Sequence, residues 1–432
     1  MPPGERDMKA PVSRVLRRIY TAVPVLLILV GTWLLGLHLY SAQRLERARS
    51  RFAREIGRLP AVDTCGWPVT DPRNGAHWYL AAAARVPATT PGFASLIPIV
   101  RHPPSTWSDA EAEQTRRVLE AARQPLALAF EATARPICEF RARSARPDEF
   151  QEAAPLVRLS RLLLADVGFE LRQARPRGAL RSIEALRRLA LGMEAQPTFA
   201  FELLGTRIEA RYLQSLHWIL GSEGVPAEVL LGLRAGLPPE SVRPALVRIF
   251  AREAGQTRSR FWDLERIRRL YAFCCVDRDS AVVVDGFSDL LSWTRVPYPL
   301  AAKACAAEQR RRGNTGEIVW SMMVANYLDV IGKYQATAAA RQLAGFALDL
   351  RIDAAARGHY PERLPTPRAD EIDPFTGAHV TYARIDHSRA RLYNSAAAAA
   401  YHELEPWDNA PILPFDWTLA KPSGGPRGGP RP

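Results

Sequence analysis

Three glutamates lie within apolar helical stretches and are the residues best suited to acid–base chemistry: Glu202, Glu209 and Glu253. Glu202 and Glu209 are seven residues apart, so they fall on one face of a helix. A carboxyl group in an apolar cleft has a raised pKa and can act as a general acid, as in glycoside cleavage. However, Arg207 and Arg211 are close enough in sequence to neutralise these acids. The pattern therefore favours a structural ion pair over a hydrolytic site.

Other catalytic and metal-binding patterns are missing from the sequence. It contains no GxxxxGK[ST] phosphate loop and no GxGxxG, HExxH, GxSxG or CxxC motif. Cys138 could act as a nucleophile, but no histidine is paired with it, and a packed or disulfide-bonded cysteine is favoured. Half of the eight histidines lie near the C-terminus without the spacing of metal ligands, namely His359, His379, His387 and His402. We therefore predict neither a cofactor nor a bound metal.

The chain is strongly basic, but the distribution of its charge disfavours nucleic acid as a partner. The 432 residues carry a formal net charge of +13, and only four of the 58 basic residues are lysines. The arginines are spread along helical patterns and alternate with acids, as in Arg161, Asp166 and Glu170, whereas a phosphate-binding surface concentrates them. A hydrophobic content of 47% excludes a wholly disordered chain, and five cysteines are too few for a disulfide-built scaffold.

An uncharged stretch near the N-terminus is the strongest single signal. No residue from Ile19 to Gln43 is charged, and residues 25–37 are almost entirely apolar. A helix needs about 20 such residues to cross roughly 30 Å of hydrocarbon, whereas a cleaved signal peptide has an apolar core of only about 7–15 residues. The sequence therefore predicts an uncleaved transmembrane helix over residues 19–43, with the lipid bilayer as its partner.

The charges that flank this helix bear on its orientation. Five basic residues precede the helix and six follow it closely, so the positive-inside count is nearly tied. A short basic N-terminus usually stays in the cytoplasm, and long domains are translocated largely regardless of charge. We expect a single-pass protein of the inner (cytoplasmic) membrane whose large C-terminal part is periplasmic or extracytoplasmic.

Apolar residues at helical spacing predict a mainly α-helical body, either an antiparallel bundle or a solenoid-like array. Ser108 and Glu111 match a capping box, which opens a helix running to about Thr133. Asn74 is expected to cap a shorter helix that stops before Pro87. Further helices are predicted over residues 155–175, 179–195, 197–221, 226–236, 239–271 and 317–357, while residues 276–300 fit either a strand or a buried helix.

The chain changes character after its last long helical pattern. That pattern is either two helices or one helix bent near Gly332, and it stops at Gly358, a residue suited to a left-handed cap. Residues 379–385 and 389–393 then alternate like two strands and predict a small β-hairpin. The tail from Lys421 is predicted to be disordered on composition.

These patterns divide the chain into six parts. They are a basic N-terminal tail (1–18), the transmembrane helix (19–43), a stalk and linker (44–73), the α-helical body (74–357), a hairpin module (358–420) and the disordered tail (421–432). The stalk is expected to continue the transmembrane helix with charged residues.

Short motifs spread over residues 60–395 carry a resemblance to other proteins. They are NGAHWYLAA from Asn74, PICEF from Pro136, LLGTRIE from Leu203, GHYPERLP from Gly358 and DPFTGAHVTY from Asp373. In this order they resemble a broad group of uncharacterised bacterial single-pass membrane proteins with an α-helical body. The resemblance implies architecture and location, and no activity comes with it.

The last two motifs also resemble the C-terminal end of type II secretion pseudopilins. In that family a long helix leads through YP and LP to a DP-aromatic-x-G turn and a hairpin. Here the membrane span lies far upstream of that helix, and no prepilin cleavage signature precedes it. The acidic, glycine-rich loop that binds calcium in many pseudopilins is replaced by Asn394, a serine and a run of alanines. The module is therefore expected to be pseudopilin-like without pilus assembly or calcium binding.

Two functional hypotheses follow. The first is a membrane-anchored extracytoplasmic scaffold or partner-binding protein, with an envelope protein as the partner and no catalysis. The alternative is a cell-envelope hydrolase using Glu202, Glu209 or Glu253. Acids that face an open cleft without arginine partners would favour the hydrolase, and acids held by arginines in the core would favour the scaffold.

Overall fold

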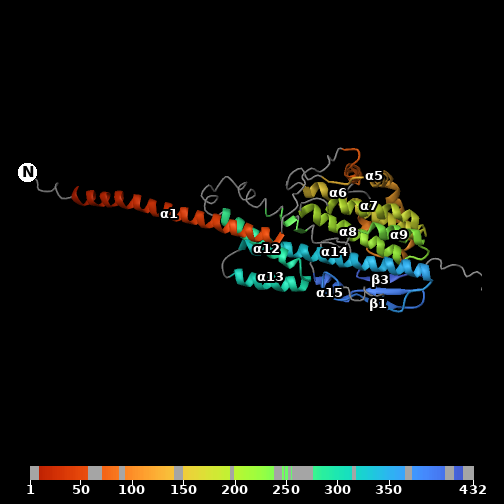
Figure 1. Ribbon diagram of the computed structural model, residues 1–432. Coiled ribbons are helices and arrows are strands. Elements are labelled where there is room, and N and C mark those ends of the chain that lie inside the picture. The colour runs from red at the N-terminus through yellow and green to blue at the C-terminus, as the bar shows by residue number, and fades with distance from the viewer. Residues whose placement is uncertain are drawn as a thin grey trace, which may run out of the picture. The chain divides into compact units, whose positions relative to one another are not determined.

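The computed structural model is predominantly α-helical, with one small sheet near the C-terminus, which confirms the predicted fold class (Figure 1). It describes residues 9–56, 71–86, 93–140, 149–194, 199–237, 246, 247, 249–251, 254, 276–313, 318–364, 372–403 and 413–421. The helices are α1 (Lys9–Ile56), α2 (Gly75–Ala84), α3 (Phe93–Ile99), α4 (Asp109–Ala121), α5 (Arg123–Thr133), α6 (Glu149–Arg172), α7 (Pro176–Glu194), α8 (Phe199–Leu220), α9 (Ala227–Gly236), α12 (Val276–Trp293), α13 (Tyr298–Gly313), α14 (Ile318–Arg357) and α15 (Ser395–Glu403). A short 3-10 helix, η1, covers Pro104–Thr106, and the strands are β1 (Thr381–Arg384), β2 (Ala390–Tyr393) and β3 (Asp416–Leu419).

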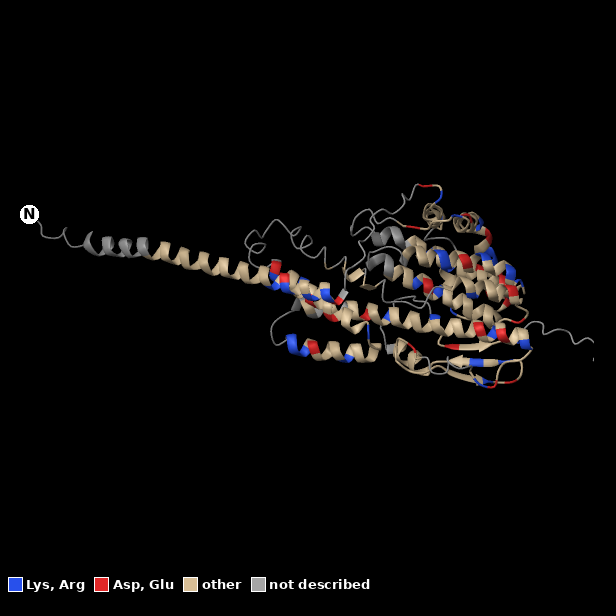
Figure 2. Cartoon of the chain, viewed as in Figure 1, with Lys and Arg blue, Asp and Glu red and all other residues tan. Residues whose placement is uncertain are grey.

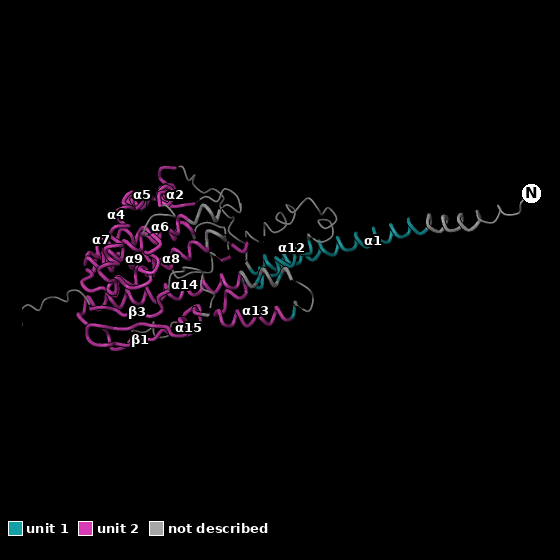
Figure 3. Tube along the Cα trace, turned by 180° about the vertical axis from the view of Figure 1, so that it is seen from behind, with its two compact units in different colours: residues 1–58, 253–290, 311–324 teal, residues 59–252, 291–310, 325–432 magenta. Residues whose placement is uncertain are grey.

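The chain divides into two compact units (Figure 3). The first comprises residues 1–58, 253–290 and 311–324, and the second comprises residues 59–252, 291–310 and 325–432.

Helix α1 of the first unit exposes a long apolar surface. Its large apolar side chains from Val23 to Tyr40 are exposed, and Figure 2 shows this part of α1 free of charged residues. About 18 residues at 1.5 Å per residue cover about 27 Å, close to the thickness of a bilayer's hydrocarbon core. Among the described helices, α1 is the one long and apolar enough to cross a membrane, with a mean hydropathy of 2.1. The predicted span of residues 19–43 lies within it.

The charged continuation of α1 is packed rather than free-standing. The predicted continuation of the helix is confirmed as far as Ile56, and residues 57–70 of the linker lie outside the described residues. Ser41, Leu45, Ala48 and Phe52 follow a spacing of three or four residues, and all four are buried. This spacing is that of a single helix face, so α1 turns from a fully exposed helix into an amphipathic one at Ser41.

An ion-pair network within the first unit joins α1 to α12. Arg51 of α1 contacts Asp289 of α12 at 2.8 Å and lies 3.8 Å from Asp285. The buried Asp289 also accepts a hydrogen bond from Arg312 at 3.1 Å and one from the Trp320 indole at 3.3 Å. The Arg312 guanidinium lies over the Trp320 ring, 4.7 Å from its centroid. Several donors therefore compensate a buried carboxylate that would otherwise be costly to desolvate.

The core of the second unit is built on α6, α7 and α8, which pack against one another. The predicted apolar face of α6 is confirmed, since Leu156, Leu159, Leu163 and Val167 have no exposed surface. Ile183, Leu186 and Leu189 of α7 and Ile208, Tyr212 and Leu216 of α8 are likewise buried. Burial at this 3.6-residue period supplies the apolar area that holds the three helices together.

One predicted helix is divided into two, and the structure resolves two assignments that the sequence left open. The capping box at Ser108 and Glu111 is confirmed, but the helix it opens ends at Ala121, and α5 begins at Arg123. Pro125 explains the break, because a proline has no N–H to donate and its ring clashes with the carbonyl four residues earlier. The segment left open at residues 276–300 forms α12 up to Trp293, and α14 runs unbroken through Gly332.

The C-terminal module contains the predicted hairpin and two further elements. Strands β1 and β2 pair antiparallel as expected, and Gly358 ends α14 with a φ of +80°. Strand β3 pairs with β2, placing Leu392 opposite Trp417, and α15 lies between the two strands in sequence. Neither β3 nor α15 was predicted. Leu392, Trp417 and Leu419 are fully buried in the same apolar core as α14, so the sheet covers part of this helix.

The DPFTG motif is a turn organised by one buried carboxylate. Asp373 accepts hydrogen bonds from the backbone N–H groups of Phe375 and Thr376, at 2.8 and 2.7 Å, and from the amide of Asn394 at 2.7 Å. Asn394 in turn accepts the N–H of Ala397 in the first turn of α15. The motif therefore stabilises the fold of the module and leaves this carboxylate fully engaged.

Gly168 offers a test of how closely the second unit is packed. A Cβ at this position of α6 would lie 2.7 Å from Cζ2 of Trp107 and 3.2 Å from Cζ3 of Trp218. Because both rings would have to shift, Gly168→Ala is expected to lower the free energy of unfolding by about 1–3 kcal/mol. The measurement is denaturant unfolding of the full chain in detergent. Gly232→Ala in α9 is the matched control, since a Cβ there meets no atom within 4 Å and should add about 0.5–1 kcal/mol. Equal effects at the two positions would contradict the packing argument.

Candidate functional site

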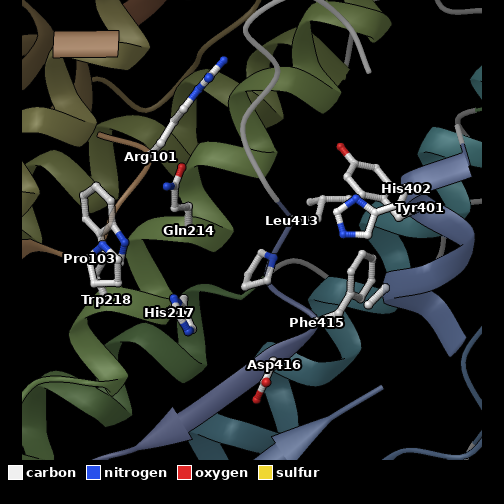
Figure 4. A pocket seen from close by; sticks show the side chains of 12 residues that line it. Arg101, Pro103, Gln214, His217, Trp218, Tyr401, His402, Leu413, Phe415 and Asp416 are labelled. Carbon is white, nitrogen blue, oxygen red and sulfur yellow. The ribbon is translucent and has the colours of Figure 1, made fainter. Parts of the chain in front are cut away.

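A pocket of about 270 Å³ lies in the second unit (Figure 4). Gln214, His217 and Trp218 form one wall because spacings of three and four residues bring them to one face of α8. The remaining lining residues are Arg101 and Pro103 after α3, Ala398, Tyr401 and His402 of α15, and Leu413, Pro414, Phe415 and Asp416 before and at the start of β3. The pocket thus combines aromatic and proline surfaces with a few polar groups, which is typical of a ligand-binding site.

The polar groups of this pocket do not form an acid–base pair. Burial lowers the pKa of His217, against the opposing effect of a hydrogen bond with the Asp416 backbone, so the imidazole is neutral at pH 7. Its ring packs edge-on against Trp417 at a centroid distance of 5.2 Å. The Asp416 carboxylate is held by Arg391, whose Nε lies 2.8 Å away. Burial raises the pKa of Tyr401 to about 12. Neutral His217 can accept a hydrogen bond or a proton from a ligand, whereas the Asp416 carboxylate is already paired and the Tyr401 hydroxyl stays protonated at neutral pH.

Glu209 is held in a buried ion pair. Arg341 of α14 donates from Nε to Oε1 of Glu209 at 2.6 Å, and both side chains are less than 10% exposed. The prediction of a structural ion pair identified the right kind of partner but not the right arginine. Arg211, expected to neutralise the acids, instead donates to Ser160 Oγ at 3.0 Å and to the carbonyl of Arg207.

The two other predicted acids are not placed in detail. Glu202 belongs to α8, but its side chain lies outside the described residues, as does the whole of Glu253. The structure therefore does not bring the three glutamates together in a described site.

Cys138 does not have the environment of a nucleophile. It carries a free thiol, and burial raises its pKa to about 12, so the thiol is protonated at neutral pH. Its sulfur packs against Gly192 of α7, where a Cβ would approach to 2.7 Å. Cys65, Cys274 and Cys275 lie outside the described residues.

Within the described part of the chain, no group of three His, Cys, Asp or Glu side chains is arranged to hold a metal ion. His359, His379, His387 and His402 are all described, and they do not form such a group.

Asp166 is a perturbed carboxyl group that the sequence reasoning did not single out. Burial raises its pKa to about 6, and Ser182 of α7 donates to its Oδ2 at 2.5 Å. The available signal was a lone acid in the apolar run Leu162 to Val167 of α6. Asp166 does not line the pocket and faces α7, so its perturbed pKa reflects helix packing.

Comparison of the chain with known protein families, curated proteins and solved structures finds no match. Any functional conclusion therefore rests on the residues and their geometry.

Glu209→Gln tests whether this acid is structural. The substitution leaves the Arg341 guanidinium buried without a counter-ion, and we expect it to destabilise the chain by about 3–5 kcal/mol. In the double variant Glu209→Gln/Arg341→Met no buried charge is left unpaired, so its loss should be smaller than the sum of the single losses. Denaturant unfolding of the four proteins gives this coupling. Unchanged stability of E209Q would contradict the structural role.

Asp166→Asn tests the perturbed carboxyl group through pH. Because the folded pKa is raised above the ordinary value of 3.8, the native state binds more protons than the unfolded state between about pH 4 and 6. Wild-type stability should therefore fall as the pH rises through this range. D166N should match the wild type near pH 4 and exceed it by up to about 3 kcal/mol above pH 6, as measured by unfolding at each pH.

Asp386→Asn is the control, because the pKa of Asp386 is shifted downward whereas that of Asp166 is shifted upward. Hydrogen bonds from Ser388 and Arg389 lower the pKa of Asp386 to about 2. D386N should therefore be less stable than the wild type at pH 7, and the difference should shrink as the pH falls towards 2. Parallel pH profiles for the two variants would refute both assignments.

Proposed function

We propose that this protein is a scaffold or partner-binding protein of the cell envelope, anchored in the inner membrane through α1, with its large C-terminal part outside the cytoplasm. The observation that carries the proposal is the continuous exposed apolar surface of α1 from Val23 to Tyr40. Such a surface is unfavourable in water and suited to a lipid environment.

The packed end of α1 supports an anchoring role. Immediately after the exposed stretch, Ser41, Leu45, Ala48 and Phe52 are buried, and Arg51 is ion-paired with Asp289. A helix that is apolar on all sides and then abruptly amphipathic fits a segment that leaves lipid and joins a folded unit.

The chemistry of the second unit supports binding over catalysis. Its pocket offers aromatic walls, a neutral His217 and a carboxylate on Asp416 that is already paired. Glu209, the described member of the predicted acids, is also paired. An acid held by an arginine in the core fits a scaffold better than a hydrolase, and Glu209 is held in this way.

Two arginines placed in the centre of the apolar stretch test the anchor. We expect the wild-type chain to remain with membranes until detergent is added, and Leu29→Arg/Val30→Arg to lose this association, because each charge costs about 2.5–3.5 kcal/mol at the centre of a membrane helix. Leu231→Arg is the matched control, since Leu231 is an exposed leucine of α9, outside the stretch. Wild-type chain that is soluble without detergent, or that loses its first forty residues on maturation, would refute the proposal.

A reporter fusion tests the orientation of the chain in the membrane. A reporter that is active only outside the cytoplasm, fused after Pro432, should be active; a stable but inactive fusion would reverse the orientation.

In a mild detergent extract the wild-type chain should migrate in native gels as a complex larger than its monomer. Migration only as a monomer would contradict the scaffold role.

A further inference from the structure

A group of arginines from three segments gathers beside the pocket of the second unit. Arg158 and Arg161 are three residues apart on α6, and Arg207 and Arg211 are four residues apart on α8. Each pair shares a helix face. Arg211 Nη1 also donates to Ser160 Oγ, the neighbour of Arg161 in α6, at 3.0 Å, which brings α8 against α6 at this point. Arg101, two residues after the end of α3, belongs to the same group, because Arg161 interacts electrostatically with Arg101 as well as with Arg158 and Arg207.

Three members of this arginine cluster have no acidic partner among the described residues. These are Arg158, Arg161 and Arg211; the Nε of Arg158 is buried without a hydrogen-bond partner. Burial and the neighbouring arginines lower the pKa of both Arg161 and Arg211. The nearby Arg341, by contrast, is neutralised by Glu209. Like charges that are partly or wholly buried without a carboxylate are unfavourable, and a bound anion would remove that cost.

The arginine cluster is continuous with the pocket. Positions 207, 211, 214 and 218 follow one face of α8, so the arginines lead directly to Gln214 and Trp218 of the pocket wall. Arg101 belongs to both features, and Gln214 fixes the segment before it by donating to the carbonyl of Val100 at 2.8 Å. Figure 4 shows Arg101 and Gln214 on one side of the pocket, with Tyr401 and Phe415 on the other.

We propose that the arginine cluster and the adjoining pocket form one binding site for a ligand that carries a phosphoryl group on an apolar, preferably aromatic, body. Several guanidinium groups favour a multiply charged phosphoryl group over a single carboxylate, and their planar N–H groups match its oxygens. Tyr401, Phe415 and Trp218 supply the surface for the apolar part. The proposal concerns the second unit alone and does not depend on membrane location.

Calorimetric titration of the full chain in a neutral sugar detergent tests the site. The probes are inorganic phosphate, phenyl phosphate and phenol, at constant ionic strength and pH 7.5. We expect saturable binding of phenyl phosphate at least about tenfold tighter than that of phosphate, and no binding of phenol, because both halves of the site contribute. Absence of saturable binding by either phosphate compound would overturn the proposal.

Variants separate the two halves of the site. Arg158→Gln/Arg161→Gln should weaken both phosphate compounds by at least about tenfold, because it removes two of the guanidinium groups. Tyr401→Ala should weaken phenyl phosphate by about three- to tenfold and leave phosphate unchanged. Arg181→Gln is the matched control, since Arg181 is an exposed arginine of α7 outside the cluster. Equal losses in R181Q and in the cluster variant would indicate non-specific electrostatics and refute the site.

The stability of the ligand-free chain distinguishes a binding role from a structural one. Relief of like-charge repulsion should raise the Tm of Arg161→Gln in the absence of phosphate while abolishing the increase that phenyl phosphate causes in the wild type. A lower Tm of ligand-free R161Q would indicate that this arginine holds the fold together and would overturn the proposal.

Competition identifies the source of the phosphoryl group. If it belongs to a lipid headgroup, phosphatidylglycerol added to the micelles should displace phenyl phosphate, and phosphatidylcholine should not. If it belongs to a soluble phosphoester, neither lipid should compete. Either result supports the phosphoryl site, whereas equal displacement by both lipids would show that the pocket recognises acyl chains without the phosphoryl charge and would refute it.

Discussion

Helix α14 is buried over most of its length in the second unit, and the cations that it carries into the core require partners there. Lys333 pairs with Asp329 one turn earlier, Arg341 with Glu209 of α8, and Arg351 with the Tyr360 hydroxyl and the Ser222 carbonyl. A buried charge without such a partner costs several kcal/mol. Glu209 and Ser222 come from α8 and the segment just after it, so these contacts hold α8 against α14. Tyr360 extends the constraint by donating to the carbonyl of Ala420, just after β3.

The first unit also buries a charged group that needs partners, in this case the Asp289 carboxylate. Its α1 helix is apolar on every side from Val23 to Tyr40 and amphipathic from Ser41, so one continuous helix is suited to two environments. Arg51 of this helix pairs with Asp289 of α12, and the Asp289 carboxylate is also bonded to Arg312 and Trp320. Sharing one buried carboxylate among three donors spreads its charge and lowers the cost of burying it.

The charged groups of the second unit fall into two classes that differ in function. Glu209, Asp373 and Asp416 are acids whose oxygens are already engaged by arginines or by backbone N–H groups, and they maintain the fold. Arg158 and Arg161 have no comparable carboxylate among the described residues, and Arg161 interacts with Arg101, which lines a pocket with aromatic walls. Groups whose charges and hydrogen bonds are satisfied stabilise the fold, whereas partly buried charges without an acidic partner among the described residues point to a ligand.

The sequence alone determined features whose causes are local. The apolar run of α1, the capping box at Ser108, the apolar face of α6, the left-handed cap at Gly358 and the β1–β2 hairpin all depend on residues within a few positions of one another. The break that Pro125 imposes between α4 and α5 also has a local cause, but it was not predicted. Only the tertiary structure decided that Glu209 pairs with Arg341, 132 residues later, that β3 completes the sheet and that Asp166 faces Ser182. Hydrogen bonds between near neighbours follow from backbone geometry, but pairings across the chain depend on which helix faces meet, and the spacing of residues does not encode that.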